Sequence, residues 1–384
     1  MEATPGRIWY LNNLGNGLNA RFARSGREAD LEAATRRWRP RLPGRRICRA
    51  TSQQFGDRTD PADLEAAIGR YEEAVEATPA GSPDLPGYLN NLGTGLSDRF
   101  ARSGREADLE AAIGRYEEAV EATPAGSPDL PSRLNNLGTG LRARFARSGR
   151  EADLEAAIGR YEEAVEATPA GSPHLPSILN NLGTGLSDRF ARSGREADLE
   201  AAIGCYEEAV EATPAGSPDL PSRLNNLGTG LSARFARSGR EADLEAAIGR
   251  YEEAVEATPA GSPDLPGYLN NLGTGLSDRF ARSGREADLE AAIGRYEEAV
   301  EATPAGSPDL PSRLNNLGTG LRARFARSGR EADLEAAIGR YEEAVEATPA
   351  GSPHLPSILN NLGTGLSDRF ARSGREDLEA AIGC

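Results

Sequence analysis

The sequence has 384 residues, a formal net charge of −15 and three cysteines. A surface this acidic repels phosphate groups, so the composition disfavours nucleic acid and anionic lipid as general partners. Cys48, Cys205 and Cys384 have neither a metal-binding nor a redox spacing, which is typical of a reducing, intracellular setting. Because we find no membrane-spanning apolar run and no secretory leader, we expect a soluble, cytoplasmic protein.

The first 61 residues are the least regular part of the chain. Residues 1–35 hold one repeat, in which LNNLGNGL begins at Leu11 and Asn12 is the first asparagine. Residues 36–61 stand where a further helix is expected and include the basic run Arg36–Arg49. Such a run could be a nucleic-acid or nuclear-localisation patch, but its position favours a decayed or frame-slipped repeat.

From residue 62 to residue 384 the chain is an array of near-identical 45-residue repeats, the last of which is truncated. One repeat runs from Asp84 to Pro128, and later repeats begin at Asp129, His174, Asp219, Asp264, Asp309 and His354. The stretch from Ala62 onward recurs 180 residues later with a single residue lost after Glu376, so part of the agreement reflects recent duplication. A repeat of this length predicts a stacked array rather than separate globular domains.

Each repeat is predicted to form two helices. In the first, apolar residues at helical spacing form a stripe that consists of Leu85, Leu89, Leu92, Leu96 and Phe100. Gly104 suits a left-handed end of this helix. In the second, the stripe consists of Leu109, Ala112, Ile113, Tyr116, Ala119 and Val120. Because one hairpin cannot bury its apolar face alone, we expect an all-α, right-handed superhelical solenoid of tandem antiparallel helix hairpins.

Several of these residues resemble the tetratricopeptide repeat. Leu89, Leu92-Gly93 and Leu96 resemble its first-helix pattern, and its second-helix pattern is matched by Ala112, Tyr116, Ala119 and Pro124. The lengthened repeat with an LNNL first helix is similar to the kinesin-light-chain type, and to arrays that accompany CHAT-type protease domains in fungi and bacteria. The resemblance implies a non-enzymatic interaction fold that holds a peptide in a groove.

The paired asparagines are the main candidates for contact with a partner. Asn90, Thr94 and Ser97 share a face of the first helix that lies away from the core stripe. An asparagine offers a donor and an acceptor, so it can bind the amide groups of an extended peptide. The resemblance to kinesin light chains implies this role for Asn90 and its equivalents. The alternative is a bond to the neighbouring repeat; we favour partner contact for Asn90 and the structural bond for Asn91.

Differences between repeats add two arginines to the candidate site. Gly87-Tyr88 is replaced by Ser132-Arg133 or Ser177-Ile178, and Ser97-Asp98 by Arg142-Ala143 or Ser232-Ala233. We interpret both positions as lying off the core, where a binding face would vary its chemistry, although drift at exposed positions predicts the same pattern. The predicted peptide-binding residues are Asn12, Asn90, Asn135, Asn180, Asn225, Asn270, Asn315, Asn360, Thr94, Thr139, Thr184, Thr229, Arg142 and Arg322.

The sequence gives no support for catalysis. The glycines of LNNLGTGL follow no strand and no lysine accompanies them, so they are not predicted to form a phosphate loop. Gly93 would let the two helices of a hairpin approach closely, whereas Gly95 and Gly114 have no role that the sequence explains. His174 and His354 replace an aspartate in a loop, which indicates surface substitution. We therefore predict no catalytic residue, no metal and no cofactor.

We predict a non-enzymatic scaffold that binds a peptide or protein segment in a concave groove. The acidic surface favours a partner with basic character, and we expect no nucleic-acid, membrane or small-molecule partner. The alternative is a sensor or regulatory arm of a larger signalling effector, of CHAT-protease or STAND-NTPase type, whose catalytic domain is not in this sequence.

Overall fold

The protein is described by a computed structural model that covers residues 61–373, and these residues form fourteen α-helices and no strand. The predicted all-α fold is therefore confirmed. The predicted repeat in residues 1–35, nearly all of the basic segment 36–61 and the truncated end lie outside the described residues, as does Asn12. None of the described helices is both long and apolar enough to cross a membrane.

The helices alternate between the two predicted types, and they match the predicted stripes. The first helices are longer and comprise α4 (Leu85–Ser103), α6 (Leu130–Ser148), α8 (Leu175–Ser193), α10 (Leu220–Ser238), α12 (Leu265–Ser283), α14 (Leu310–Ser328) and α16 (Leu355–Ser373). The second helices are α3 (Pro61–Glu76), α5 (Glu106–Glu121), α7 (Glu151–Glu166), α9 (Glu196–Glu211), α11 (Glu241–Glu256), α13 (Glu286–Glu301) and α15 (Glu331–Ala347).

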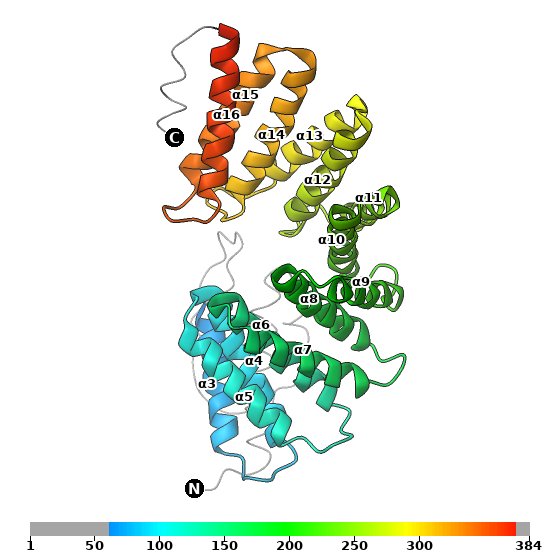
Figure 1. The fold of residues 1–384 in the computed structure, drawn as a ribbon. Coiled ribbons are helices and arrows are strands. Elements are labelled where there is room, and N and C mark those ends of the chain that lie inside the picture. Colours follow the sequence, from blue (N-terminus) through cyan, green and yellow to red (C-terminus); the bar gives the residue numbers. More distant parts are fainter. Residues whose placement is uncertain (1–60, 374–384) are drawn as a thin grey trace. The chain divides into compact units, whose positions relative to one another are not determined.

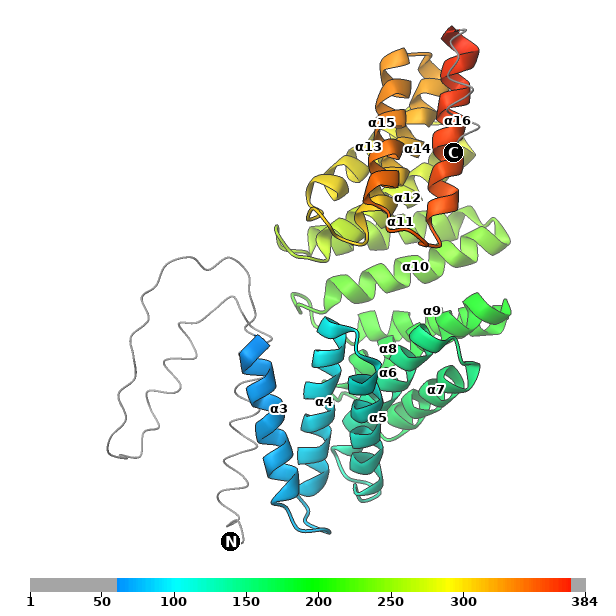
Figure 2. The ribbon, with the colours of Figure 1, turned by 90° about the vertical axis from the view of Figure 1, so that its left-hand side faces the viewer.

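The chain divides into two compact parts, Met1–Gly185 and Leu186–Cys384. Within each part, a first helix packs most extensively on the second helix that follows it, as an antiparallel hairpin, and less extensively on the second helix before it (Figure 1). In the first part, for example, α4 lies between α3 and α5 (Figure 2). Consecutive hairpins of one part therefore share a continuous apolar core, as a helical repeat array requires.

The ends of the first helices follow from local sequence. A proline in the first turn, such as Pro86 in α4, suits the helix start because its missing N–H would have no partner there. Gly104 ends α4 with a φ of 68°, and its N–H donates to the carbonyl oxygen of Phe100. This left-handed conformation is the one predicted, and it favours glycine because a side chain would be strained there.

Two glycines of α4 let neighbouring helices approach closely. A Cβ atom at Gly93 would lie 2.7 Å from the Tyr116 ring of the same hairpin, which confirms the predicted close approach. At Gly95, a Cβ atom would lie 3.0 Å from Cγ1 of Ile68 in the preceding repeat. The role of Gly95, which the sequence did not reveal, is therefore to admit the second helix of the repeat before it.

Candidate functional site: the face of the first helices

Neighbouring first helices are joined by a row of hydrogen bonds between asparagine side chains. Nδ2 of Asn136 donates to Oδ1 of Asn90 at 3.0 Å, across 46 residues of sequence. We call this row the asparagine ladder. Its other described bonds, of 2.9–3.0 Å, run from Asn181 to Asn135, Asn271 to Asn225, Asn316 to Asn270 and Asn361 to Asn315. The second asparagine of these repeats thus makes the inter-repeat bond that we favoured for Asn91.

The first asparagine of five described repeats is the acceptor of the same bond. Its side-chain oxygen accepts a hydrogen bond from the next repeat. For that oxygen, the alternative of a bond between repeats therefore holds in Asn90, Asn135, Asn225, Asn270 and Asn315. The amide nitrogens of these five side chains donate to no described residue, and the residues are only half-buried. The ladder therefore leaves a row of N–H donors on the face of the first helices.

The candidate threonines are tied to their own hairpins. Oγ1 of Thr94 donates to the backbone oxygen of Asn90 at 3.1 Å and accepts from the Tyr116 hydroxyl at 3.4 Å. Burial raises the pKa of Tyr116 to about 12, and the hydrogen bond with Thr94 partly offsets that rise. The equivalent bonds join Tyr161 to Thr139 and Tyr251 to Thr229. These threonines hold neutral tyrosines in place; their contact with a partner stays a prediction.

The first variable position lies in the core, so its interpretation as a position off the core is wrong. Tyr88, Arg133 and Ile178 are only 5%, 8% and 2% exposed. Tyr88 packs against Ala74 of the preceding second helix, and Ile178 packs against Ala164 in the same way. The buried face of the first helix is thus wider than the narrow leucine stripe, because it packs on two second helices rather than one.

Arg133 shows how this buried position accepts a charge. Its guanidinium donates to the hydroxyl of Thr123 and pairs with Asp129 at 3.0 Å. Burial lowers the pKa of Arg133, and Asp129 partly offsets the effect. Tyrosine, arginine and isoleucine at this position therefore alter the packing between repeats rather than the chemistry presented to a partner.

The second variable position does lie at the surface. Arg142 and Arg322 are both half-buried on first helices. Nε of Arg322 in α14 lies 2.7 Å from Oδ2 of Asp368 in α16, and the two side chains are 37% and 35% exposed. Arg322 is therefore already paired within the chain, and its contact with a partner remains a prediction.

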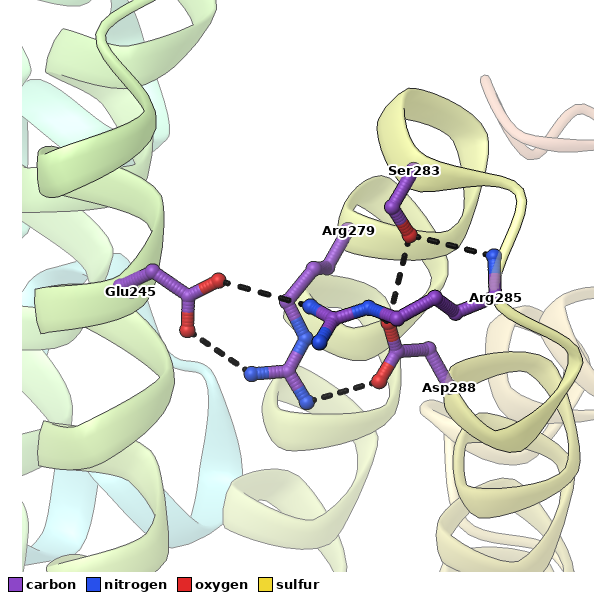
Figure 3. Close-up of polar contacts among 5 residues, drawn as sticks. All are labelled: Glu245, Arg279, Ser283, Arg285 and Asp288. Carbon is purple, nitrogen blue, oxygen red and sulfur yellow. Dashed lines mark hydrogen bonds and ion pairs between the residues drawn. The ribbon is translucent and has the colours of Figure 1, made fainter.

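Arginines that the sequence analysis did not single out link three helices each. Arg279 of α12 contacts Asp288 of its own hairpin and Glu245 of the preceding repeat, each at 2.8 Å (Figure 3). We call this arrangement the arginine clamp; it recurs at Arg99, Arg144, Arg234 and Arg324. The signal was present in the sequence, since each clamp arginine has a glutamate 34 residues before it and an aspartate nine residues after it.

The aspartate of each clamp is buried. Asp288 is 6% exposed, and Figure 3 shows Arg279, Ser283 and Arg285 converging on its carboxylate. Burial alone would lower the pKa of Arg279, but hydrogen bonds to Asp288 and Glu245 outweigh burial and raise it. The equivalent Asp108 pairs with Arg99 at 2.7 Å in the same way.

The two loop histidines and a pair of adjacent glutamates on the second helix lie on the surface. His174 and His354 are exposed in loops, as expected of surface substitutions. Glu117 and Glu118 are exposed on α5, where Glu118 pairs with Arg115 of the same helix at 2.8 Å. Within residues 61–373, no group of three or more His, Cys, Asp or Glu side chains is placed to hold a metal ion.

Comparison with known proteins shows the fold. No family model matches the chain, and no curated protein matches it. A solved monomeric IFIT1 mutant with Gppp-AAAA is 16% identical, with a TM-score of 0.54, and the match covers 82% of this chain and 62% of that one. The human IFIT1 dimer with m7Gppp-AAAA is 16% identical with a TM-score of 0.52, and the match covers 82% and 61% of the two chains.

A bacterial structure belongs to the same group of matches. The C-terminal part of a TPR repeat-containing protein from Cytophaga hutchinsonii is 14% identical, with a TM-score of 0.46, and the match covers 77% of this chain and 95% of that one. This chain spans less than two thirds of the length of the IFIT1 chains that it matches. Its paired antiparallel hairpins form a helical solenoid fold that is similar to the fold of IFIT1.

Proposed function

We propose that this protein is a non-enzymatic scaffold whose first-helix face holds an extended segment of a protein partner. The observation that carries the proposal is the row of amide nitrogens left by the asparagine ladder. The same arrangement is found in five of the described repeats, in which the amide oxygen accepts the ladder bond and the amide nitrogen donates to no described residue. Backbone carbonyl oxygens of an extended peptide are matching acceptors whatever its side chains.

The chemistry of the partner follows from the charge of the chain. A net charge of −15 favours a segment with basic residues and disfavours nucleic acid and anionic membranes. We also propose that the repeat is of the kinesin-light-chain type, in which asparagines bind the peptide. A role as the sensor arm of a larger effector would use the same face.

The proposal is tested with two sets of substitutions in the ladder. Replacing Asn225, Asn270 and Asn315 with alanine removes both the inter-repeat acceptor and the free donor. Replacing the same three residues with aspartate keeps an acceptor for the ladder bond and removes the donor; it also adds negative charge, so binding is compared at high salt, which screens that charge. We expect both triple variants to bind library peptides more weakly, by about 0.5–1.5 kcal/mol per lost hydrogen bond, as measured by fluorescence anisotropy.

Circular dichroism separates this loss from unfolding, and the aspartate set should keep its helical content. A folded aspartate variant that binds every peptide as tightly as the wild type would show that the ladder amides do not hold the partner. Gppp-AAAA is measured in parallel, because IFIT1 was solved with it. Tight binding of that molecule, with no peptide binding, would contradict the proposed partner class.

A further inference from the structure

The ladder sets the register in which neighbouring first helices face one another. Each ladder bond joins residues 46 positions apart, as in Asn361 to Asn315. Seven residues further along the same two helices, Arg322 faces Asp368, also 46 positions apart. Seven residues are close to two helical turns, so both pairs lie on the same side of the helices. We call the second pair of positions the seam.

The seam between α10 and α12 has the same register but lacks the cation. The bond from Asn271 to Asn225 aligns these helices, and seven residues further on Ser232 stands where α14 has Arg322. Its partner position holds Asp278, as α16 holds Asp368. Both residues act on the Tyr251 hydroxyl, since Ser232 lowers the pKa of Tyr251 and the charge of Asp278 raises it.

Asp278 is a carboxylate without a counter-ion. It is half-buried, and no residue of the described chain donates a hydrogen bond to it or forms an ion pair with it. Burial raises the pKa of Asp278, because removal from water penalises the charged form. The α14–α16 seam shows the group that relieves this penalty elsewhere in the same fold, a guanidinium 2.7 Å from the carboxylate.

We propose that Asp278 anchors an arginine side chain of the bound protein segment, which takes the place that Arg322 occupies in the other seam. The inference rests on the proposed function and names the anchor residue of its partner. A guanidinium suits the site because it stays charged and donates several N–H bonds in one plane. Asp278 lies about 10 Å along the helix from Asn271, a distance that about three residues of extended chain cover.

The test uses synthetic peptides in matched pairs. A library of fifteen-residue peptides is screened against the full-length protein, and each binding peptide is remade with every arginine replaced by citrulline. Citrulline has the shape of arginine without the charge. We expect citrulline to weaken binding to the wild type by about tenfold, as loss of one charge-assisted bond implies, and to have little effect on binding to Asp278→Asn.

Two further variants make the assignment specific. Ser232→Arg places an arginine opposite Asp278 within the chain, so it should remove the advantage of arginine peptides over their citrulline forms. Asp368→Asn removes a carboxylate that Arg322 already occupies, and should leave that advantage within about twofold of the wild type. Circular dichroism and thermal melting confirm that each variant is folded before binding is compared.

The outcomes separate this inference from the proposed function. Equal weakening by citrulline on the wild type and on Asp278→Asn, or binding that never depends on arginine, would overturn the anchor while leaving the peptide-binding face intact. A folded wild-type protein that binds no peptide in the library would overturn both.

Discussion

Each clamp arginine balances a carboxylate that is buried in the hairpin core. Arg144 pairs with Asp153 at 2.7 Å and with Glu110 of the preceding repeat at 2.9 Å. Asp153 is 6% exposed, and at this repeat no second arginine pairs with it among the described residues. Removing one member of such a pair leaves an uncompensated charge in a poorly solvated place, which costs more than the pair contributes when intact.

Substitution of Arg144 with glutamine should lower the free energy of unfolding by about 2–3 kcal/mol, since Asp153 would stay buried without its cation. The matched control is Arg147→Gln on the same helix. Arg147 lies 3.7 Å from Glu106, and both side chains are more than half exposed, so this change should have almost no effect. Urea denaturation followed by circular dichroism measures both. Equal losses in the free energy of unfolding would show that the clamp stabilises the protein no more than an exposed ion pair does.

At the level of the helical elements, glycines inside helices have opposite roles in the two helices of a hairpin. A Cβ atom at Gly273 of α12 would lie 2.7 Å from the Tyr296 ring and 3.2 Å from the carbonyl oxygen of Ala292. A Cβ atom at Gly294 of α13 would meet nothing within 4 Å. The first glycine is required by the packing of the hairpin, and no contact in the structure explains the second.

The same substitution at these two sites should therefore change stability in opposite directions. Gly294→Ala should raise the free energy of unfolding by about 0.5–1 kcal/mol, because alanine favours the helix. Gly273→Ala should lower it by about 1–3 kcal/mol, because the added methyl group overpacks the hairpin against Tyr296. Thermal and urea denaturation of the two variants provide the comparison. If Gly273→Ala raised the free energy of unfolding, the two helices of the hairpin would be able to move apart for the added methyl group without losing stability.

At the scale of the whole molecule, the described packing contacts and hydrogen bonds join helices of the same repeat or of adjacent repeats. Within each compact part, the helices that pack together belong to the same repeat or to adjacent repeats. The ladder and the clamp follow the same rule, since their bonds span 46 and 34 residues. In such an array, stability is close to a sum of repeat terms and nearest-neighbour terms.

Removal of whole 45-residue repeats from the C-terminal end should therefore lower stability in steps. Each shortened protein should stay helical, and its midpoint of urea denaturation should fall with every repeat removed, as nearest-neighbour coupling requires. Circular dichroism and urea titration of a truncation series measure this. If the first truncation abolished all cooperative structure, the chain would behave as one globular domain rather than as an array.

Much of this structure could be predicted from local patterns. The leucines from Leu89 to Leu96 recur at helical spacing, and Gly104 ends the helix as its sequence context indicates. Apolar periodicity and helix-end signals depend on residues within a few positions of one another, so the sequence alone determined the helices, the hairpins and the repeat array. It also determined the absence of a phosphate loop at LNNLGTGL, which lies inside α4.

Contacts between repeats were decided only by the tertiary structure. The sequence could not place Arg133 in the core, because the width of the buried face depends on how many helices pack on it. Nor could it show that Asn90 shares its oxygen with Asn136, or that Asp278 stands opposite a serine rather than an arginine. These features depend on the register between helices about one repeat apart. Close packing at Gly95 against Ile68 of the preceding repeat contributes to that register, and local propensity does not encode it.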